Sequence, residues 1–310
     1  MADAQPVPIV AANVPQAAED PFAEEEEDDV DEEEELVEEG GPSTPLSLDD
    51  PRRMDLTPEE HGWALVIKEL VEEEDGLDTL SDYWYAQVAL VDKGDVANSM
   101  ERIHHMQLFR QEYDIQDTVA QAERAVAKYM ELFPECFLSF SYNSASGNYT
   151  QIIDISKFHA SVIKKHPTAH KVWFQAAYYV NHALCSDMDA IRRGMTFLLE
   201  CMDFDWKKNF GLEMLRPYWC DIAGFYPLNI HTFRYFHTGV FVNMLTSMAK
   251  KFMPVAMRDQ FELGCINVSG SLSPIFLAPT VEAANERTMS RFLHSLELRY
   301  KNEESFTLKT

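Results

Sequence analysis

The sequence predicts an α/β protein in which a mainly parallel β-sheet is flanked by helices, preceded by a small helical subdomain and a disordered acidic tail. Three observations support this prediction. Carboxylates dominate the first 50 residues, helical periodicity alone continues from there to about residue 133, and apolar extended segments then alternate with helices, as in βαβ units. The expected boundaries are 1–55 for the tail, 56–135 for the helical subdomain and 136–310 for the sheet domain.

The tail is defined by its charge. Residues 1–50 contain 18 Asp or Glu and no Lys or Arg. Self-repulsion and scarce apolar surface predict that the segment is disordered. It acts either as a solubilising tail or as a docking arm for a basic protein partner. The other 260 residues carry 26 basic and 34 acidic side chains, and without a cationic surplus we expect no nucleic-acid partner.

Composition indicates a soluble, cytoplasmic protein with a sizeable core. Hydrophobic residues make up 46% of the chain and aromatic residues 12%, enough to bury a large apolar interior. The five cysteines are widely spaced and include no Cys-x-x-Cys pair, so we expect reduced thiols. The N-terminus lacks a signal-peptide pattern, and no uncharged stretch is apolar enough to span a membrane.

The helical subdomain is predicted to begin at Thr57, which can cap a helix whose capping box closes with Glu60. This helix is expected to reach about residue 74. Hydrophobic periodicity predicts three more helices, and the last of them stops before Pro134. Their expected ranges are 80–91, 95–111 and 117–132.

The sheet domain is predicted from β-rich segments that follow turn residues. Strands are expected at 149–155, 194–202 and 230–236, and 260–268 also has an extended pattern. Helices are expected at 172–185, at 240–252 and at 281–300, and an amphipathic helix is expected through Leu212, Leu215, Trp219 and Ile222. Right-handed crossovers would place helices on the faces of the sheet.

Motifs for catalysis and phosphate binding are absent from the sequence. It contains no G-x-x-x-x-G-K-[ST], no G-x-G-x-x-G and no G-x-S-x-G. His166 and His170 have the spacing of metal ligands on one helix face, but Pro167 lies between them. Asp203 and Asp205 indicate a polar turn. Since no nucleophile–base pair or metal cluster can be assembled, we expect no enzyme activity, metal or cofactor.

A wide apolar stripe follows the last of these strands. Phe, Met and Leu recur at helical spacing from Val240 to Phe252. Periodicity alone leaves two interpretations open, because such a stripe packs as ordinary core or covers a ligand as a lid.

The residues around this stripe resemble the CRAL-TRIO family of lipid-binding domains, which includes retinaldehyde-binding, tocopherol-transfer and phosphatidylinositol-transfer proteins. The resemblance covers roughly 80–268 and is most specific over 191–264. It is carried by Phe225-Tyr226-Pro227, the strand at 230–236, the turn at Thr238-Gly239, the helix at 240–252 followed by Met253, and Leu263-Gly264.

The resemblance implies a parallel sheet that forms the floor of an apolar pocket, with the helix at 240–252 as a mobile gate above it. It implies a protein that binds a hydrophobic lipid and transfers or presents it at a membrane surface. Positions that hold the headgroup in phosphatidylinositol-binding members are Leu228 and Asp259 here, so the resemblance does not specify which lipid is bound. The expected pocket residues are Phe197, Leu199, Trp219, Phe233, Tyr235, Phe241, Met244, Leu245 and Met248.

The alternative is an interaction scaffold with the same fold. Its pocket would be filled by the protein's own aromatic side chains, and its acidic tail would recruit a basic partner.

Overall fold

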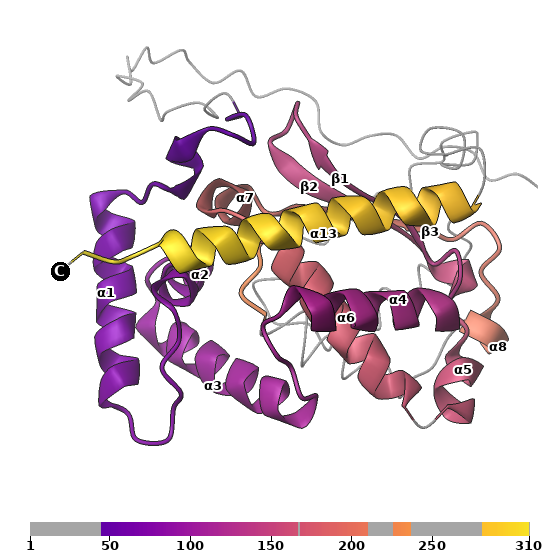
Figure 1. Cartoon of the computed structure of the whole chain (residues 1–310), viewed down its shortest axis with the longest axis horizontal. Coiled ribbons are helices and arrows are strands. Elements are labelled where there is room, and N and C mark those ends of the chain that lie inside the picture. The colour runs from indigo at the N-terminus through magenta and orange to yellow at the C-terminus, as the bar shows by residue number, and fades with distance from the viewer. Residues whose placement is uncertain (1–44, 167, 210–225, 237–280, 310) are drawn as a thin grey trace, which may run out of the picture. The chain divides into compact units, whose positions relative to one another are not determined.

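The computed structural model describes residues 45–166, 168–209, 226–236 and 281–309 (Figure 1). Residues 44–310 form one compact unit. Within it, an open mixed β-sheet is flanked by helices, which confirms the α/β class. The predicted disorder of residues 1–44 and the predicted gate helix at 240–252 lie outside the described residues.

The described sheet has four strands in the order β1-β2-β3-β4. Three of the predicted extended segments are confirmed as β2, β3 and β4, and both pairings among them are parallel. The fourth, at 260–268, lies outside the described residues. The sheet differs from the prediction at its edge, because an additional strand, β1, pairs antiparallel with β2. The strand bounds are β1 (Phe137–Asn143), β2 (Asn148–Asp154), β3 (Met195–Glu200) and β4 (Ile230–Phe236).

The four predicted helices of the N-terminal half are all present. The capping box at the start of the first helix is formed, since the Thr57 N–H donates to Glu60 Oε2 at 2.8 Å and the Glu60 N–H donates to Thr57 Oγ1 at 3.2 Å. This reciprocal pair satisfies two N–H groups at the helix start. The bounds are α1 (Pro58–Glu73), α2 (Asp82–Asp92), α3 (Val96–Glu112) and α4 (Val119–Leu132).

The remaining described helices surround the strands. Helices α6 (Ala169–Leu184) and α13 (Val281–Ser305) confirm the predictions at 172–185 and 281–300. The long helix α13 packs along the edge strand β1 and against α6, α4 and α2 (Figure 1). The short elements are η2 (Ile155–Lys157), α5 (Ala160–Lys165), α7 (Met188–Arg193) and α8 (Trp206–Asn209).

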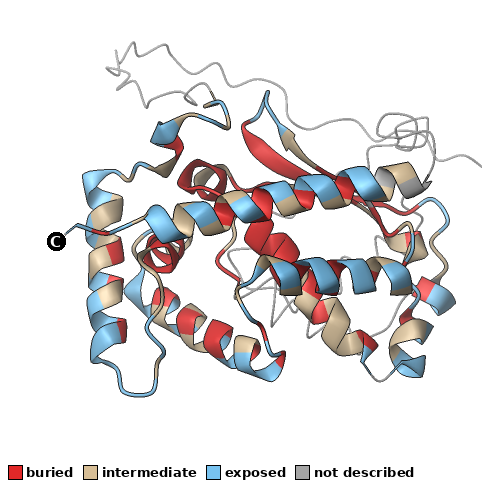
Figure 2. Ribbon diagram, in the orientation of Figure 1, coloured by how far each residue is buried: buried red, intermediate tan, exposed pale blue. Residues whose placement is uncertain are grey.

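One apolar core joins the N-terminal helices to the sheet (Figure 2). Tyr129 of α4 stacks on Phe137 of β1 with ring centroids 4.5 Å apart, and Phe292 of α13 meets Phe140 edge to face at 6.3 Å. Burying each such side chain stabilises the fold by about 1.5–3 kcal/mol. Helices α4 and α13 therefore cover the face of the sheet that carries Phe137 and Phe140.

The last part of the predicted tail (1–55) is ordered, because it contains a 3-10 helix, η1 (Pro51–Met54). The reason is Arg53, which is 1% exposed. Its guanidinium forms ion pairs with Asp187 at 2.9 Å and Asp189 at 3.2 Å, and it donates a hydrogen bond to the Tyr142 hydroxyl at 3.0 Å. These contacts tie the segment before α1 to α7 and β1.

A glycine sets the junction between α7 and β3. Gly194 has φ 70° and ψ −176°, a conformation that is essentially restricted to glycine. A Cβ atom there would lie 2.8 Å from the Asn229 carbonyl oxygen. Gly194 thus lets β3 begin directly beside the residue that precedes β4.

Candidate functional site

The structure brings four of the nine predicted pocket residues together on two neighbouring strands. Phe197 and Leu199 lie two residues apart on β3, so they share one face of the sheet, and both are buried. Their register partners on β4 are Phe233 and Tyr235, respectively. Tyr235 is half-buried, and the side chain of Phe233 lies outside what the structure describes.

The other five predicted pocket residues lie outside the described residues, as does the gate helix in which four of them fall. They are Trp219, Phe241, Met244, Leu245 and Met248. An enclosed pocket beneath a gate helix therefore stays a prediction.

The face that carries Phe197 is continuous with the main core. Phe197 pairs in register with Gln151 of β2, and Gln151 pairs with Phe140 of β1. Because register partners on adjacent strands face the same side, Phe197 lies on the side of the sheet that α13 covers over β1. Phe197 and Leu199 belong to the common core cluster, while Tyr235 at the next strand is more exposed.

The Tyr-Pro dipeptide that carries the family resemblance is held by three helices. Gln87 of α2 donates to the Pro227 carbonyl at 2.6 Å, and Arg102 of α3 donates to the Tyr226 carbonyl at 3.3 Å. The Tyr226 hydroxyl hydrogen-bonds Nδ1 of His182 in α6 at 2.9 Å. The N-terminal helices thus fix the position of the chain just before β4.

A buried polar cluster, which the sequence analysis did not find, lies next to this dipeptide and centres on Arg299 of α13. The Arg299 side chain is completely buried. Its Nη1 donates to Gln87 Oε1 at 2.5 Å and to the Cys185 carbonyl at 3.0 Å, and its Nε donates to Glu303 Oε2 at 3.2 Å. The guanidinium also lies 3.8 Å from the ring centre of Tyr83. The cluster links α13 to α2 and to the end of α6.

The imidazole of His182 in this cluster is held neutral. Burial lowers its pKa well below the usual range, and the positive charges of Arg299 and Arg110 lower it further. The Glu303 carboxylate lies 3.9 Å from His182 Nε2 and would favour the charged form. For the pKa of His182, the lowering caused by complete burial outweighs the raising effect of the Glu303 carboxylate, whose charge Arg299 already neutralises. His182 therefore has a structural role as a hydrogen-bonding group.

A polar cleft of about 270 Å³ adjoins the cluster and includes residues of α2, α3 and α13. Trp84, Arg110, Asp117 and Glu303 are among its lining residues. Three of its charged side chains are paired, because Arg110 forms an ion pair with Asp117 and Glu303 accepts from Arg299. Burial raises the pKa of Asp117, and the neighbouring Arg110 opposes this. This pairing is typical of a structural network.

The three cysteines in the described residues are free and buried. Burial raises the pKa of the Cys136 and Cys185 thiols to about 12. Because the thiolate is the reactive form, neither of these two side chains is activated as a nucleophile.

No protein-family model matches the chain, and no curated protein matches it either. Among the helices that the structure describes, none combines the length and the apolar character needed to cross a membrane.

Proposed function

We propose that this protein binds a hydrophobic lipid over the apolar face of its sheet and transfers or presents it at a membrane surface, without catalysing a reaction. The observation that supports this most is the register of the two parallel strands, which places Phe197 beside Phe233 and Leu199 beside Tyr235. Strand β4 then ends at Phe236, shortly before the apolar stripe that begins at Val240.

The proposed mechanism follows from the free energy of apolar burial. A lipid gains roughly 0.8 kcal/mol for each CH₂ group that leaves water. Opening a lid in water would expose side chains such as Phe241 and Leu245, each at a cost of about 1.5–3 kcal/mol. At a bilayer these side chains would enter another apolar medium. Contact with a membrane would therefore control lipid exchange.

The hydrogen bonds to Tyr226 and Pro227 are consistent with a fixed segment before β4 and a movable segment after it. They fix the start of β4 against α2, α3 and α6. A lid that follows the other end of β4 could then move while the floor of the pocket keeps its position.

One observation favours the alternative function, an interaction scaffold whose pocket is filled. Phe197 and Leu199 are only 4% and 7% exposed and belong to the common core. In a scaffold, aromatic side chains of the protein itself would occupy the space over β3 and β4, and the acidic tail would recruit a basic partner.

Native mass spectrometry of the full chain purified from cells tests the lipid proposal. We expect a co-purified hydrophobic molecule. Protein that is repeatedly ligand-free, and that binds no retinoid, tocopherol, sterol or phospholipid, would instead support the scaffold.

Lid variants test the mechanism. Phe241→Asp or Leu245→Asp is expected to slow transfer of a bound lipid between vesicles while the protein stays folded. Leu108→Asp is the matched control, because Leu108 in α3 is already 63% exposed. Equal transfer rates in all three variants would mean that the stripe is ordinary core.

A further inference from the structure

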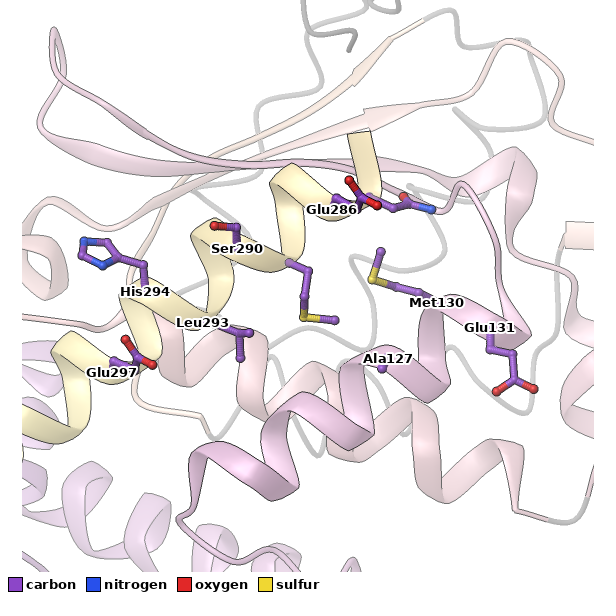
Figure 3. A pocket seen from close by; sticks show the side chains of 10 residues that line it. Ala127, Met130, Glu131, Glu286, Ser290, Leu293, His294 and Glu297 are labelled. Atoms are coloured by element: carbon purple, nitrogen blue, oxygen red, sulfur yellow. The ribbon is translucent and has the colours of Figure 1, made fainter. Parts of the chain in front are cut away.

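An open groove of about 820 Å³ lies between α4 and α13 (Figure 3). Its floor is apolar and is formed by Ala127 and Met130 of α4 and by Met289 and Leu293 of α13. Met130 and Leu293 point toward the space between the two helices (Figure 3). Met130, Met289 and Leu293 are half-buried and Ala127 is exposed, so this floor is accessible to another molecule.

Carboxylates line the rim of the groove. Glu131 belongs to α4, and Glu286 and Glu297 belong to α13; all three are exposed. Glu131 is paired with Lys128 at 2.8 Å, whereas Glu286 and Glu297 have no ion-pair partner among the residues that the structure describes. The rim therefore presents two carboxylates that are unpaired within the described part of the chain, beside an apolar floor.

We propose that this groove binds an amphipathic helix of a partner protein whose apolar face is flanked by Lys or Arg. The negative charge on the rim favours a positively charged occupant over the negatively charged alternatives. The protein's own tail has 18 carboxylates in 50 residues, a second copy carries a net charge of −26, and an anionic membrane or a nucleic acid is also negative. Each of these would be repelled by the rim. None of the residues that line the groove is among the nine expected pocket residues.

The spacing on α13 specifies the partner further. Glu286 and Glu297 are eleven residues apart, which corresponds to about 16 Å along an α-helix. A partner helix lying along the groove would place one basic residue near each of them. Apolar residues four and seven positions after the first basic residue would then meet the floor. Methionine suits such a floor, because its flexible side chain adapts to different apolar partners.

The test uses the full-length protein and a fluorescein-labelled synthetic helical peptide. This peptide carries two Lys eleven positions apart, with Leu four and seven positions after the first Lys; a control peptide has Glu in place of both Lys. Fluorescence anisotropy is expected to show saturable binding of the first peptide only. The methyl NMR signals of Met130 and Met289, assigned with Met→Leu variants, are expected to shift on its addition.

Two variants with matched controls localise the binding. The double variant Glu286→Lys/Glu297→Lys is expected to weaken binding about tenfold. The control Glu72→Lys/Glu73→Lys changes the net charge equally at exposed positions of α1 and keeps the acidic tail. Ala127→Trp fills the groove without changing charge, and Ala97→Trp at an exposed position of α3 is its control.

The pattern across these variants decides the proposal. Weaker binding in both groove variants, with near-normal binding in both controls, supports it. Equal weakening in the two charge variants would show attraction to the protein's overall charge and overturn the proposal. Unchanged binding in Ala127→Trp, or no binding to the native protein, would also overturn it. Circular dichroism confirms that each variant is folded.

Discussion

Replacing Arg299 with Met is expected to lower the free energy of unfolding by about 4 kcal/mol. The change removes the donor for Gln87, the Cys185 carbonyl and Glu303 in a fully buried position. Leaving the partly buried Glu303 carboxylate and the buried Gln87 amide oxygen without their cationic donor costs about 3 kcal/mol together, and losing a desolvated cation–π contact with Tyr83 costs about 2 kcal/mol. Burial of the Met side chain offsets part of this sum. The loss is large beside a typical domain stability of about 5–15 kcal/mol.

Urea unfolding followed by tryptophan fluorescence measures this loss, and Trp84 is a local reporter because the guanidinium lies 5.3 Å from its ring centre. The matched control is Lys301→Met on the exposed side of the same helix, expected to change stability by less than about 0.5 kcal/mol. Adding Glu303→Gln to Arg299→Met should cost less than the sum of the single changes, by about 1–3 kcal/mol. A loss for Arg299→Met below about 1.5 kcal/mol, or strict additivity with Glu303→Gln, would refute this reasoning.

Three further predictions concern stability. The folded state keeps His182 neutral, whereas the unfolded chain protonates it below about pH 6.5. The free energy of unfolding is therefore expected to fall below that pH by up to about 1.4 kcal/mol per pH unit. Thermal melts at a series of pH values should show a shallower acid slope for His182→Gln, and an unchanged slope would contradict this role of His182. Gly194→Ala should cost about 2–3 kcal/mol in urea unfolding, because its Cβ would meet the Asn229 carbonyl; a neutral result would mean that the strands shift at no cost. Arg53→Met should cost about 3–5 kcal/mol in the same assay by leaving Asp187 buried without its partner, and Arg53→Met/Asp187→Asn should recover part of that loss if the pairing is responsible.

Much of the fold could be predicted from the sequence, because local signals and tertiary packing agree in most elements. The capping box at Thr57 sets the start of α1, and the segment at 230–236 became β4 with the predicted bounds. The edge strand β1 was missed although the alternation from Leu138 to Tyr142 favours a strand. Serines alternate with aromatic residues after Phe137, and a bulge between Phe137 and Ser139 interrupts the alternation.

The predicted site and the buried polar network show where sequence reasoning stops. Alternation along β3 was enough to select Phe197 and Leu199 as neighbours on one face. No local pattern, however, links Arg53 to Asp187 or Arg299 to Gln87, because these pairs are separated by more than a hundred residues and meet only after the helices pack. Arginine side chains also lie mostly at protein surfaces, so burial of Arg53 and Arg299 was not expected. For the Arg53 pairs alone, a signal is the cluster of Asp187 and Asp189, whose carboxylates need a partner if they are buried.

The ion pairs of Arg53 have a practical consequence for anyone who shortens this chain for crystallisation or recombinant expression. A truncation at residue 56, where the tail was expected to end, would delete a cation whose two partner carboxylates lie in the interior. Leu46 would be deleted as well, although its carbonyl accepts hydrogen bonds from Arg53 and from the Tyr142 hydroxyl. A shortened protein should therefore start no later than residue 45, so that the acidic arm is removed and the anchor of the folded unit is retained.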